Sequence, residues 1–319
     1  MMVRTPTLDD IRQAQARIAG IALSTPLLRL CADAPAEIWL KLENLQPIGS
    51  FKIRGAANAM AQLGPGELAR GVLAASAGNM AQGVAWCARE RRIPCTVIAP
   101  DTAPAAKTQA IERLGARVIL VPFERWWQVF QERAFPGVEG TFIHAFDDDR
   151  VMAGNGTIGL EILEELPDVD AVVIPWGGGG LASGIAIALR ALRPECRIYA
   201  AEVGTAAPLA PSLAAGSPQV VDYRPSFVDG IGSRTVFPRM FERAQQLLDG
   251  SLVAGLAEIA AAVAVLAQRS RVVAEGAGAC ALANALAGRA GGGRIVCIVS
   301  GGNIDAGRFR EALAGRVPE

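Results

Sequence analysis

The sequence predicts an α/β protein with a mostly parallel sheet covered by helices on both faces. Short runs rich in β-branched residues alternate with longer runs rich in Ala, Leu and Arg, as expected for strands joined by crossover helices. The strand runs are apolar throughout, as in Ala171–Pro175, so both of their faces are expected to be buried. At 319 residues, 51% of them hydrophobic, the chain is long enough for two α/β units that share one compact body.

The first helix has the clearest boundaries. Thr7 can cap a helix over Leu8–Ile18, with Asp10 three residues after the cap and Gly20 at its end. The further expected helices are Ala77–Arg91, Ala103–Leu114, Gly156–Leu166, Leu181–Leu192, Leu256–Gln268 and Gly276–Leu286. The expected strands are Ile38–Leu42, Gly71–Ala75, Cys95–Ala99, Val118–Val121, Ala171–Pro175, Arg197–Ala201 and Ile295–Ser300. The Pro-rich stretch Ala206–Pro225 is predicted to be an irregular surface region.

Composition excludes several classes of function. The formal net charge is zero and no basic stripe is present, so nucleic acid is not an expected partner. No apolar run reaches the roughly 18–20 residues of a membrane span, so no membrane association is expected. The six cysteines form no CxxC pair, which predicts small core residues in a reducing cytoplasm. His144 is the only histidine, so a serine-hydrolase triad or a two-histidine zinc site is hard to build.

The segment Ile48–Gly55 holds one of only three lysines, Lys52, and the other two are Lys41 and Lys107. Arginine carries almost all of the remaining positive charge, and arginine does not lose its proton to become an amine nucleophile. Any Schiff-base chemistry therefore has three candidates. Lys52 is the one that follows a Gly-Ser turn and begins a helix-like run.

Four consecutive glycines, Gly177–Gly180, lie between a predicted strand and a predicted helix. Glycines let the backbone approach an anion, and the helix N-terminus supplies free N–H groups, so the run predicts a phosphate site. The alternative interpretation is a flexible turn with glycines chosen for close packing. Gly177, Gly179 and Ala182, with Glu202 about 20 residues on, also fit a dinucleotide fingerprint, which makes an NAD(P)-dependent oxidoreductase the alternative from another class.

Two further polar segments follow predicted strands. In Ser76–Gln82, a hydroxyl, an amide and free backbone N–H groups suit a substrate carboxylate, although a helix cap explains them equally well. In Ser300–Asn303, a serine followed by glycines can direct its hydroxyl into a cleft, although a turn with a cap is the simpler interpretation.

Together these segments resemble the fold-type-II pyridoxal-phosphate enzymes, and within them the threonine/serine dehydratases (threonine ammonia-lyases). The resemblance runs from about residue 20 to the end of the chain. The matching segments, in family order, are Lys41–Pro47, Gly49–Gly55, Ser76–Asn79, Gly177–Gly180, Phe227–Gly232, Glu275–Gly278 and Ser300–Asn303. The resemblance implies two open, mostly parallel twisted sheets with helices on both faces, similar to tryptophan synthase β. It also implies a large cofactor-binding domain, residues 1–48 and 150–319, and a smaller, mobile α/β domain, residues 49–149.

The resemblance implies a role for each matched segment. Lys52 would form a Schiff base with pyridoxal 5′-phosphate and later act as general base. Phe51 would pack near the ring, Asn79 would hydrogen-bond its phenolic oxygen, and Ser300 would face its nitrogen. The implied cofactor-binding residues are Phe51, Lys52, Asn79, Gly177, Gly178, Gly179, Gly180, Leu181, Gly230, Glu275 and Ser300. The implied substrate-binding residues are Ser76, Ala77, Asn79 and Met80.

The chain departs from the family pattern at three places. Met80 stands where the family usually has histidine, so a substrate other than threonine becomes an alternative. Ala77 stands where serine racemases carry a proton-transferring serine, so racemisation is expected to be slow. Some relatives bind a metal through a carboxylate, a carbonyl four residues on and an Asp six residues on. Glu202 and Ala206 could supply the first two ligands, but Pro208 stands at the position of the third, so no metal is expected.

The expected function is pyridoxal-phosphate-dependent dehydration and deamination of L-threonine or L-serine to a 2-oxo acid and ammonia. Within the same fold, the alternatives are a dehydratase of another β-hydroxy amino acid (hydroxyaspartate or a product of compatible-solute breakdown), a serine racemase-like enzyme, and a catalytically silent relative. The expected partners are a small amino-acid substrate and, by resemblance, further copies of the chain in a dimer or tetramer.

Overall fold

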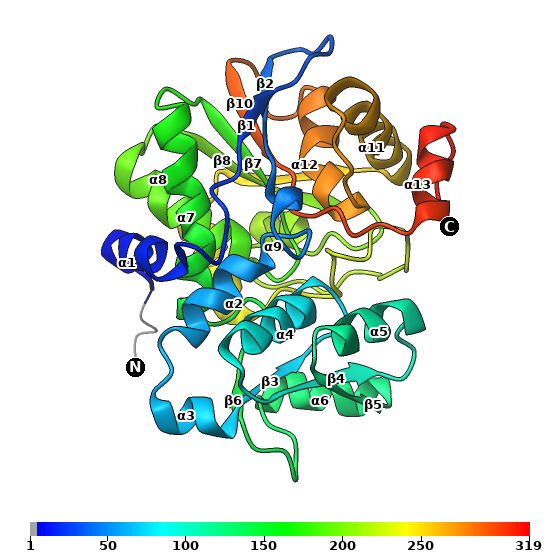
Figure 1. Cartoon of the computed structure of the whole chain (residues 1–319). Helices are drawn as coiled ribbons and strands as arrows, with labels where there is room; N and C mark the ends of the chain where they lie inside the picture. The colour runs from blue at the N-terminus through cyan, green and yellow to red at the C-terminus, as the bar shows by residue number, and fades with distance from the viewer. Residues whose placement is uncertain (1–4) are drawn as a thin grey trace.

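The computed structural model describes residues 5–319 and contains two β-sheets with helices on both faces of each (Figure 1). The six-stranded sheet has the spatial order β1-β2-β10-β7-β8-β9, and only the pairing of β1 with β2 is antiparallel. Its strands are β1 Leu27–Arg29, β2 Glu37–Lys41, β7 Ala171–Pro175, β8 Arg197–Val203, β9 Gly250–Ala254 and β10 Arg294–Ile298. The predicted α/β class and the mostly parallel sheets are therefore confirmed.

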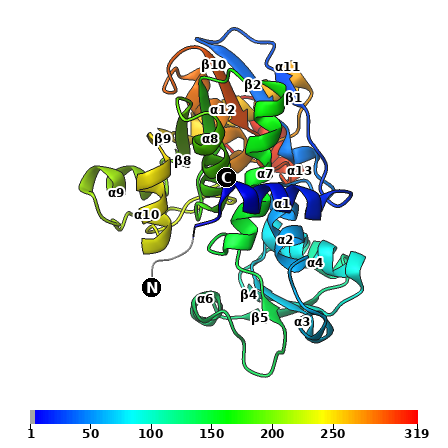
Figure 2. The same cartoon turned by 90° about the vertical axis from the view of Figure 1, so that its left-hand side faces the viewer.

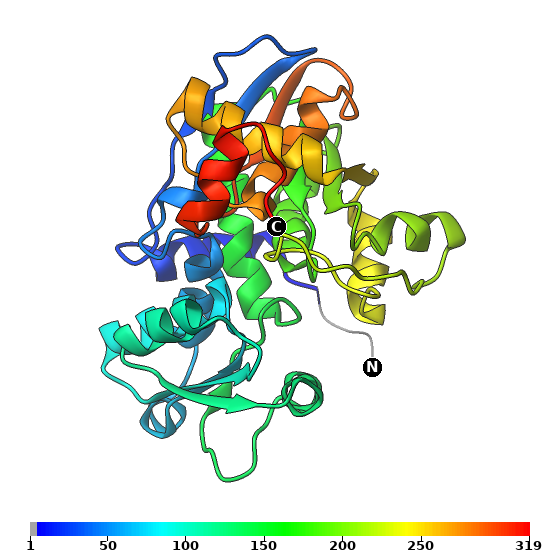
Figure 3. The same cartoon turned by 90° about the vertical axis from the view of Figure 1, so that its right-hand side faces the viewer.

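Two hydrophobic cores cover the two faces of the six-stranded sheet. Ala171 and Val173 of β7 belong to one core, and Val172 and Ile174 belong to the other, as the two-residue period of a strand requires. The first core is covered by α11 (Leu256–Ser270), α12 (Gly276–Leu286) and α13 (Ala306–Leu313), and Figure 3 shows α13 in red beside α11. The second core is covered by α7 (Asp149–Glu165), α8 (Gly180–Leu192) and α10 (Pro238–Leu247).

The smaller sheet has four parallel strands in the order β5-β4-β3-β6. Its strands are β3 Val72–Ala75, β4 Cys95–Pro100, β5 Arg117–Val121 and β6 Thr141–Phe142. One face packs against α2 (Lys52–Met60), α4 (Asn79–Arg91) and α5 (Ala105–Arg113). The opposite face packs against α6 (Phe123–Glu132), and Figure 2 shows α4 and α6 on opposite sides of this sheet.

The strands of the smaller sheet all lie within residues 72–142, and those of the larger sheet lie within 27–41, 171–203, 250–254 and 294–298. This distribution is the pattern that the predicted division of the chain requires. The boundaries themselves, at 48/49 and 149/150, and the mobility of the smaller domain stay predictions.

The N-terminal helix α1 (Leu8–Ile18) is capped as predicted. The Thr7 hydroxyl accepts from the Asp10 backbone N–H, and the Asp10 carboxylate accepts from the Thr7 N–H at 2.9 Å. Gly20, just beyond the helix, has a φ of +77°. This left-handed conformation suits glycine and ends the helix.

Sequence patterns missed several elements, which include α3 (Pro65–Arg70) and the short strands β1, β6 and β9. The prediction of an irregular region over Ala206–Pro225 was wrong in part, because α9 (Leu209–Ala215) lies within it. Pro208 occupies the N-cap position of α9, and Pro211 lies in its first turn. A proline is tolerated there because the N–H that it lacks would have no partner within the helix.

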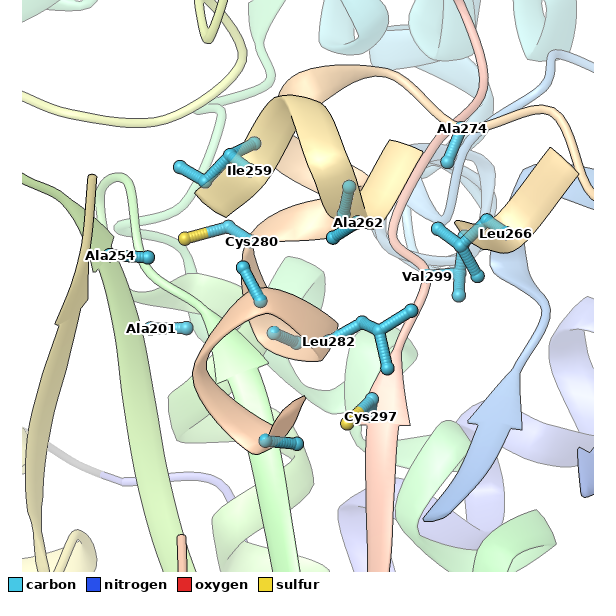
Figure 4. Close-up of a cluster of buried hydrophobic side chains, with 14 of the residues drawn as sticks. Ala201, Ala254, Ile259, Ala262, Leu266, Ala274, Cys280, Leu282, Cys297 and Val299 are labelled. Atoms are coloured by element: carbon cyan, nitrogen blue, oxygen red, sulfur yellow. The ribbon is translucent and has the colours of Figure 1, made fainter. Parts of the chain in front are cut away.

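The cysteines lie mainly in the core, as predicted. Five are buried, and Cys31 is exposed. Figure 4 shows Cys280 and Cys297 among the apolar side chains that fill the first core of the larger sheet. No helix within residues 5–319 is long and apolar enough to cross a membrane.

A buried cluster of charges joins α2 to the larger sheet. Arg54 in α2 makes a two-pronged ion pair with Glu43, with both N–O distances at 2.8 Å, and Arg54 Nη2 also lies 2.8 Å from Glu161 of α7. Glu43 belongs to the short helix η1 (Glu43–Leu45), which follows β2. Burial raises the pKa of Glu43, but the charge and hydrogen bonds of Arg54 outweigh burial and hold this pKa below its ordinary value.

Candidate active site

Glycines allow α2, α7 and α8 to pack with their backbones in close contact. A Cβ atom at Gly154 of α7 would lie 2.4 Å from the carbonyl oxygen of Arg54 in α2. A Cβ atom at Gly184 of α8 would lie 2.3 Å from the carbonyl oxygen of Met152 in α7. Real side chains cannot approach so closely, so these glycines hold the helix that carries Lys52 near the helix that follows the tetraglycine run.

Lys52 is the first residue of α2, and it is the only lysine whose amine is not ion-paired among residues 5–319. Its Nζ donates a hydrogen bond to the carbonyl oxygen of Ala145 at 2.8 Å and lies 5.0 Å from the centroid of the Phe51 ring. By contrast, Lys41 Nζ lies 2.8 Å from a Glu161 oxygen, and Lys107 Nζ lies 2.8 Å from Asp229.

The environment of Lys52 favours its neutral form. Burial lowers its pKa to about 8, against a weaker opposing effect of the Glu275 carboxylate. Relative to an ordinary lysine, this pKa increases the neutral fraction at pH 7 by about 300-fold. The amine can therefore act as a nucleophile and as a base near neutral pH.

The tetraglycine loop follows β7 and Trp176 and leads directly into α8. A Cβ atom at Gly178 would lie 2.0 Å from the Phe146 ring, and one at Gly180 would lie 2.8 Å from the Phe146 Cα. Gly179 has a φ of +88°, and a Cβ atom there would lie 2.4 Å from the Trp176 ring. Close packing against two aromatic residues therefore requires glycine at these three positions.

The same loop presents a row of free hydrogen-bond donors. Within residues 5–319, no hydrogen bond is found from the backbone N–H groups of residues 177–182. The first backbone bond of α8 starts only at Ser183, whose N–H donates to the Gly179 carbonyl at 2.8 Å. The positive end of the α8 dipole lies at this point as well. Six free N–H groups at a helix N-terminus fit a phosphate, so the residues present suit the cofactor that the resemblance implies.

Asn79, at the start of α4, is held by two polar residues from the larger sheet. Its Nδ2 donates to Glu275 Oε1 at 2.9 Å, and its Oδ1 accepts from Asn303 Nδ2 at 2.8 Å. Asn303 Nδ2 also donates to the carbonyl oxygen of Ile48 at 2.9 Å. Since a backbone carbonyl can only accept, Asn303 must present its nitrogen there, which fixes the orientation of the Asn79 amide. One N–H of Asn79 then remains to be used by a ligand.

Glu275 occupies the N-cap position of α12 and is buried beside this amide. Burial raises its pKa to about 7, Asp229 adds to the rise, and Asn79, Lys107 and Lys52 oppose it. A Cβ atom at Gly230 would lie 3.2 Å from Glu275 Oε1, and one at Gly301 would lie 2.6 Å from it. The carboxyl group of Glu275 is therefore enclosed by Asn79 and two glycines.

The segment after β10 joins this group to the lysine. The carbonyl oxygen of Ser300 accepts from the Phe51 N–H at 3.1 Å, and Ser50 pairs with Gly301 in an antiparallel bridge. Ser300 is 4% exposed. The predicted site residues Phe51, Lys52, Asn79, Glu275 and Ser300 therefore occupy one connected region of the structure.

The start of α4 forms a second helix N-terminus near the lysine. A Cβ atom at Gly83 of α4 would lie 3.3 Å from the backbone of Lys52, so the two helices touch there. The Ser76 hydroxyl accepts from the Gly78 N–H at 3.2 Å, and a Cβ atom at Gly78 would meet nothing within 4 Å. Ser76 and Ala77 are half-buried beside this open space.

The side chain of Met80 lies elsewhere. It is 2% exposed and belongs to the hydrophobic core between α4 and the smaller sheet. Leu181 is likewise buried, in a core of the larger sheet. Both residues lie in the first turn of a helix, Met80 in α4 and Leu181 in α8. Each can therefore contribute only its backbone N–H group to the site.

Glu202 does not extend the site. It is 1% exposed, and its two oxygens accept from the Leu209 and Ala210 N–H groups of α9, each at 2.8 Å. Ser251 donates a further bond of 2.6 Å. Burial raises the pKa of Glu202, and these bonds oppose the rise. Because Glu202 caps α9, it offers no free group to the ribose of a dinucleotide.

The chain belongs to the family of pyridoxal-phosphate dependent enzymes, whose sequence profile matches residues 18–301. It is 41% identical to the L-threonine ammonia-lyase of Thermotoga maritima over 308 residues, which cover 94% of this chain and 76% of that protein. Its fold is similar to that of maize serine racemase, with a TM-score of 0.88 and 32% identity over 98% of each chain. It is also similar to threonine deaminase isoform 2 of Solanum lycopersicum, with a TM-score of 0.85 and 31% identity over 99% of this chain and 96% of that one.

The family match confirms the predicted pyridoxal-phosphate fold and cofactor, and it displaces the oxidoreductase hypothesis for residues 177–182. Sequence reasoning missed three neighbours of Lys52 and the glycine loop: Ala145, Phe146 and Trp176. No motif marked them, because Ala145 acts through its carbonyl and the two aromatic residues act through shape. Asn303 was within a recognised segment, but its contact with Asn79 depends on tertiary packing.

Proposed function

We propose that this protein is a pyridoxal-phosphate-dependent ammonia-lyase that removes water and then ammonia from L-threonine or L-serine, releasing a 2-oxo acid. The Thermotoga maritima relative is named an L-threonine ammonia-lyase, and the Solanum lycopersicum neighbour is named a threonine deaminase. The observation that carries the proposal is the Lys52 amine. Its pKa is lowered to about 8, and its hydrogen-bond partner is a neutral carbonyl.

The glycine loop and Asn79 would hold the cofactor. The free N–H groups of residues 177–182 would bind its phosphate, with Leu181 contributing through its backbone. Asn79 would donate its second amide hydrogen to the ring oxygen, since Glu275 already accepts the first. Phe51, Gly230 and Ser300 would line the ring.

Lys52 would carry the proton transfer at the substrate. When bound, pyridoxal phosphate withdraws electrons from the substrate α-carbon and makes its proton acidic. Lys52 would hold the cofactor at rest, and after the substrate amine replaces it, Nζ would accept the α-proton. Both tasks need a neutral amine, and a pKa of about 8 leaves roughly a tenth of the amines neutral at pH 7.

The N-terminus of α4 would bind the substrate carboxylate. Within residues 5–319, no hydrogen bond is found from the backbone N–H groups of Ala77, Asn79 and Met80. These groups and the Ser76 hydroxyl suit an anion at the positive end of the helix dipole. Met80 would then contribute its backbone N–H, whereas its side chain stabilises the core.

We also propose, from the family resemblance, that the protein acts in the cytoplasm as a homo-oligomer.

Ala77 has no group that can move a proton, which supports dehydration over racemisation. Residues 5–319 contain no group of three or more His, Cys, Asp or Glu residues arranged to hold a metal.

The proposal is tested by measuring 2-oxo acid release over a panel of L-threonine, L-serine, their D-isomers and hydroxyaspartate. We expect kcat/KM for L-threonine or L-serine to exceed that for every other substrate by at least about tenfold. Chiral chromatography of the same reactions measures racemisation, which should be the slower reaction.

Enzyme whose imine has been reduced by borohydride is the control, and it should release no 2-oxo acid. Faster turnover of hydroxyaspartate would replace the proposed substrate. Faster formation of D-serine than of 2-oxo acid would replace the proposed reaction. A yellow protein that acts on no member of the panel would be a silent relative.

A further inference from the structure

The only histidine of the chain lies in the connection between β6 and α7. His144 is 2% exposed, and its ring packs against Phe130, with centroids 4.5 Å apart, and edge-on against Phe146, with centroids 4.7 Å apart. Within residues 5–319, no hydrogen bond joins it to Ser76, Ala77, Asn79 or Met80, where the substrate is proposed to bind. Its burial therefore calls for an explanation other than acid–base catalysis on the substrate.

The ring nitrogen of His144 organises the backbone that follows it. His144 Nδ1 accepts hydrogen bonds from the N–H of Phe146 at 3.2 Å and from the N–H of Asp147 at 2.8 Å. An acceptor must carry a lone pair, so Nδ1 is unprotonated. Burial lowers the pKa of His144 to about 4, with Arg133 and Lys52 lowering it further and Asp147 and Asp148 opposing them, in agreement with a neutral ring.

The turn that His144 closes touches both halves of the cofactor site. The Ala145 carbonyl accepts the hydrogen bond of the Lys52 amine, and Phe146 packs against Gly178 and Gly180 of the glycine loop. The next residue, Asp147, is ion-paired with Arg133 at 2.7 Å and with Arg239 at 2.8 Å. A shift of this short turn would therefore move the lysine's partner and the support of the loop together.

We propose that His144 is a positioning residue, which uses its Nδ1 acceptor to hold the 145–147 backbone so that the Ala145 carbonyl directs Lys52 and Phe146 supports the glycine loop. The residue acts through the turn and does not touch the reacting atoms. The proposal concerns the cofactor site and does not depend on which amino acid is the substrate.

A pair of substitutions separates the acceptor from the aromatic ring. Asparagine at position 144 keeps an acceptor that can bond to N–H groups two and three residues on, as in an Asx turn, but it has no ring. Phenylalanine keeps the ring but has no acceptor. A residue that only fills space should tolerate His144→Phe better than His144→Asn, whereas a residue that positions the turn should show the opposite order.

The measurement is the dissociation constant of pyridoxal phosphate, obtained by spectroscopic titration without substrate, together with kcat and KM of the holoenzyme. We expect His144→Phe to weaken cofactor binding about tenfold and to lower kcat with little change in KM. We expect His144→Asn to stay within about threefold of the wild type. Because the titration uses no substrate, its result stands even if the proposed reaction is wrong.

Phe130→Leu is the matched control, because it disturbs the same aromatic cluster without touching the Nδ1 hydrogen bonds. Its cofactor affinity should change less than twofold. If phenylalanine at 144 prevents folding, as near-ultraviolet circular dichroism would reveal, His144→Leu removes the acceptor with a smaller side chain and carries the same expectation. Tight cofactor binding by the variants without an acceptor, or equal losses in His144→Phe and Phe130→Leu, would overturn the proposal.

Discussion

Two lysines only eleven positions apart show what pairing does to a buried charge. Lys41 at the end of β2 has a fully buried side chain and is ion-paired with Glu161 at 2.8 Å and with Glu165 at 3.4 Å. Lys52 at the start of α2 donates to a single neutral carbonyl. Carboxylates stabilise the charge of Lys41, whereas burial without an ion-pair partner lowers the pKa of Lys52 and increases its neutral fraction.

The paired cluster also anchors the helix that begins at Lys52. Arg54 lies two residues after Lys52 and is 1% exposed, and it is held by Glu43 and Glu161. This anchor fixes the first turn of α2 to η1 and α7. The comparison therefore indicates that paired buried charges provide rigidity, and the amine without a carboxylate partner is the one for which we propose the catalytic role.

Substituting each of the two lysines by a neutral residue should have the largest effects, on activity at Lys52 and on stability at Lys41. We expect Lys52→Ala to reduce 2-oxo acid formation by at least about 10³-fold while the urea unfolding midpoint stays close to that of the cofactor-free wild type. We expect Lys41→Met to lower the free energy of unfolding by about 3 kcal/mol, because it leaves a buried carboxylate under-compensated, while borohydride still labels Lys52.

Each variant is the control for the other, because one is expected to change activity and the other stability. Retained turnover in Lys52→Ala would refute the assignment of the catalytic amine. Unchanged stability in Lys41→Met would mean that Arg54 alone compensates Glu161, and the contrast between the two sites would then be smaller than the geometry indicates.

A second test compares two glycines of the proposed site. Gly178→Ala would place a methyl group 2.0 Å from the Phe146 ring, whereas Gly78→Ala would place one in open space. Overpacking of this kind costs about 2 kcal/mol, so we expect Gly178→Ala to weaken cofactor binding about 30-fold. Gly78→Ala should change it less than about threefold. Equal dissociation constants for the two variants would show that the glycine loop moves freely and does not form a rigid cradle.

The third and smallest effect is the pH dependence of the cofactor-free protein. The pKa of Glu275 is raised from 4.5 to about 7, so its contribution to stability is full below pH 4.5 and is lost as the pH rises through 7. The pKa of Lys52 is lowered from 10.5 to about 8, so its contribution is full above pH 10.5 and is lost as the pH falls through 8. These two groups together should place a minimum of stability between about pH 7 and 8.

We expect Glu275→Gln to remove the fall in the free energy of unfolding between pH 4.5 and 7, a change of about 1–2 kcal/mol. Urea unfolding at a series of pH values measures it. Glu258→Gln is the control, because the pKa of Glu258 is lowered and its contribution is lost only as the pH falls toward its folded pKa. A profile for Glu275→Gln that keeps the wild-type fall would assign the pH dependence to another group.

The sequence predicted some parts of the fold and site closely and others not at all. The capped helix α1 and the strand β7 have the bounds expected from local patterns. The two-residue strand β6 and the helix α9 were missed, because β6 is too short to show a period and the prolines of α9 obscure its helical pattern. Met80 was predicted to contact substrate from its place in a motif, whereas packing directs its side chain into the core.

What the sequence by itself determined was the α/β class, the family and the order of the motifs that carry Lys52, Asn79, the glycine loop and Ser300. Each of these depends on residues that are neighbours in the chain. Only the tertiary structure decided which lysine is paired, which way the Asn79 amide faces and which turn packs against the glycine loop. Those outcomes depend on burial and on partners far apart in the sequence, because water is excluded and charges are matched only after the helices and sheets have packed.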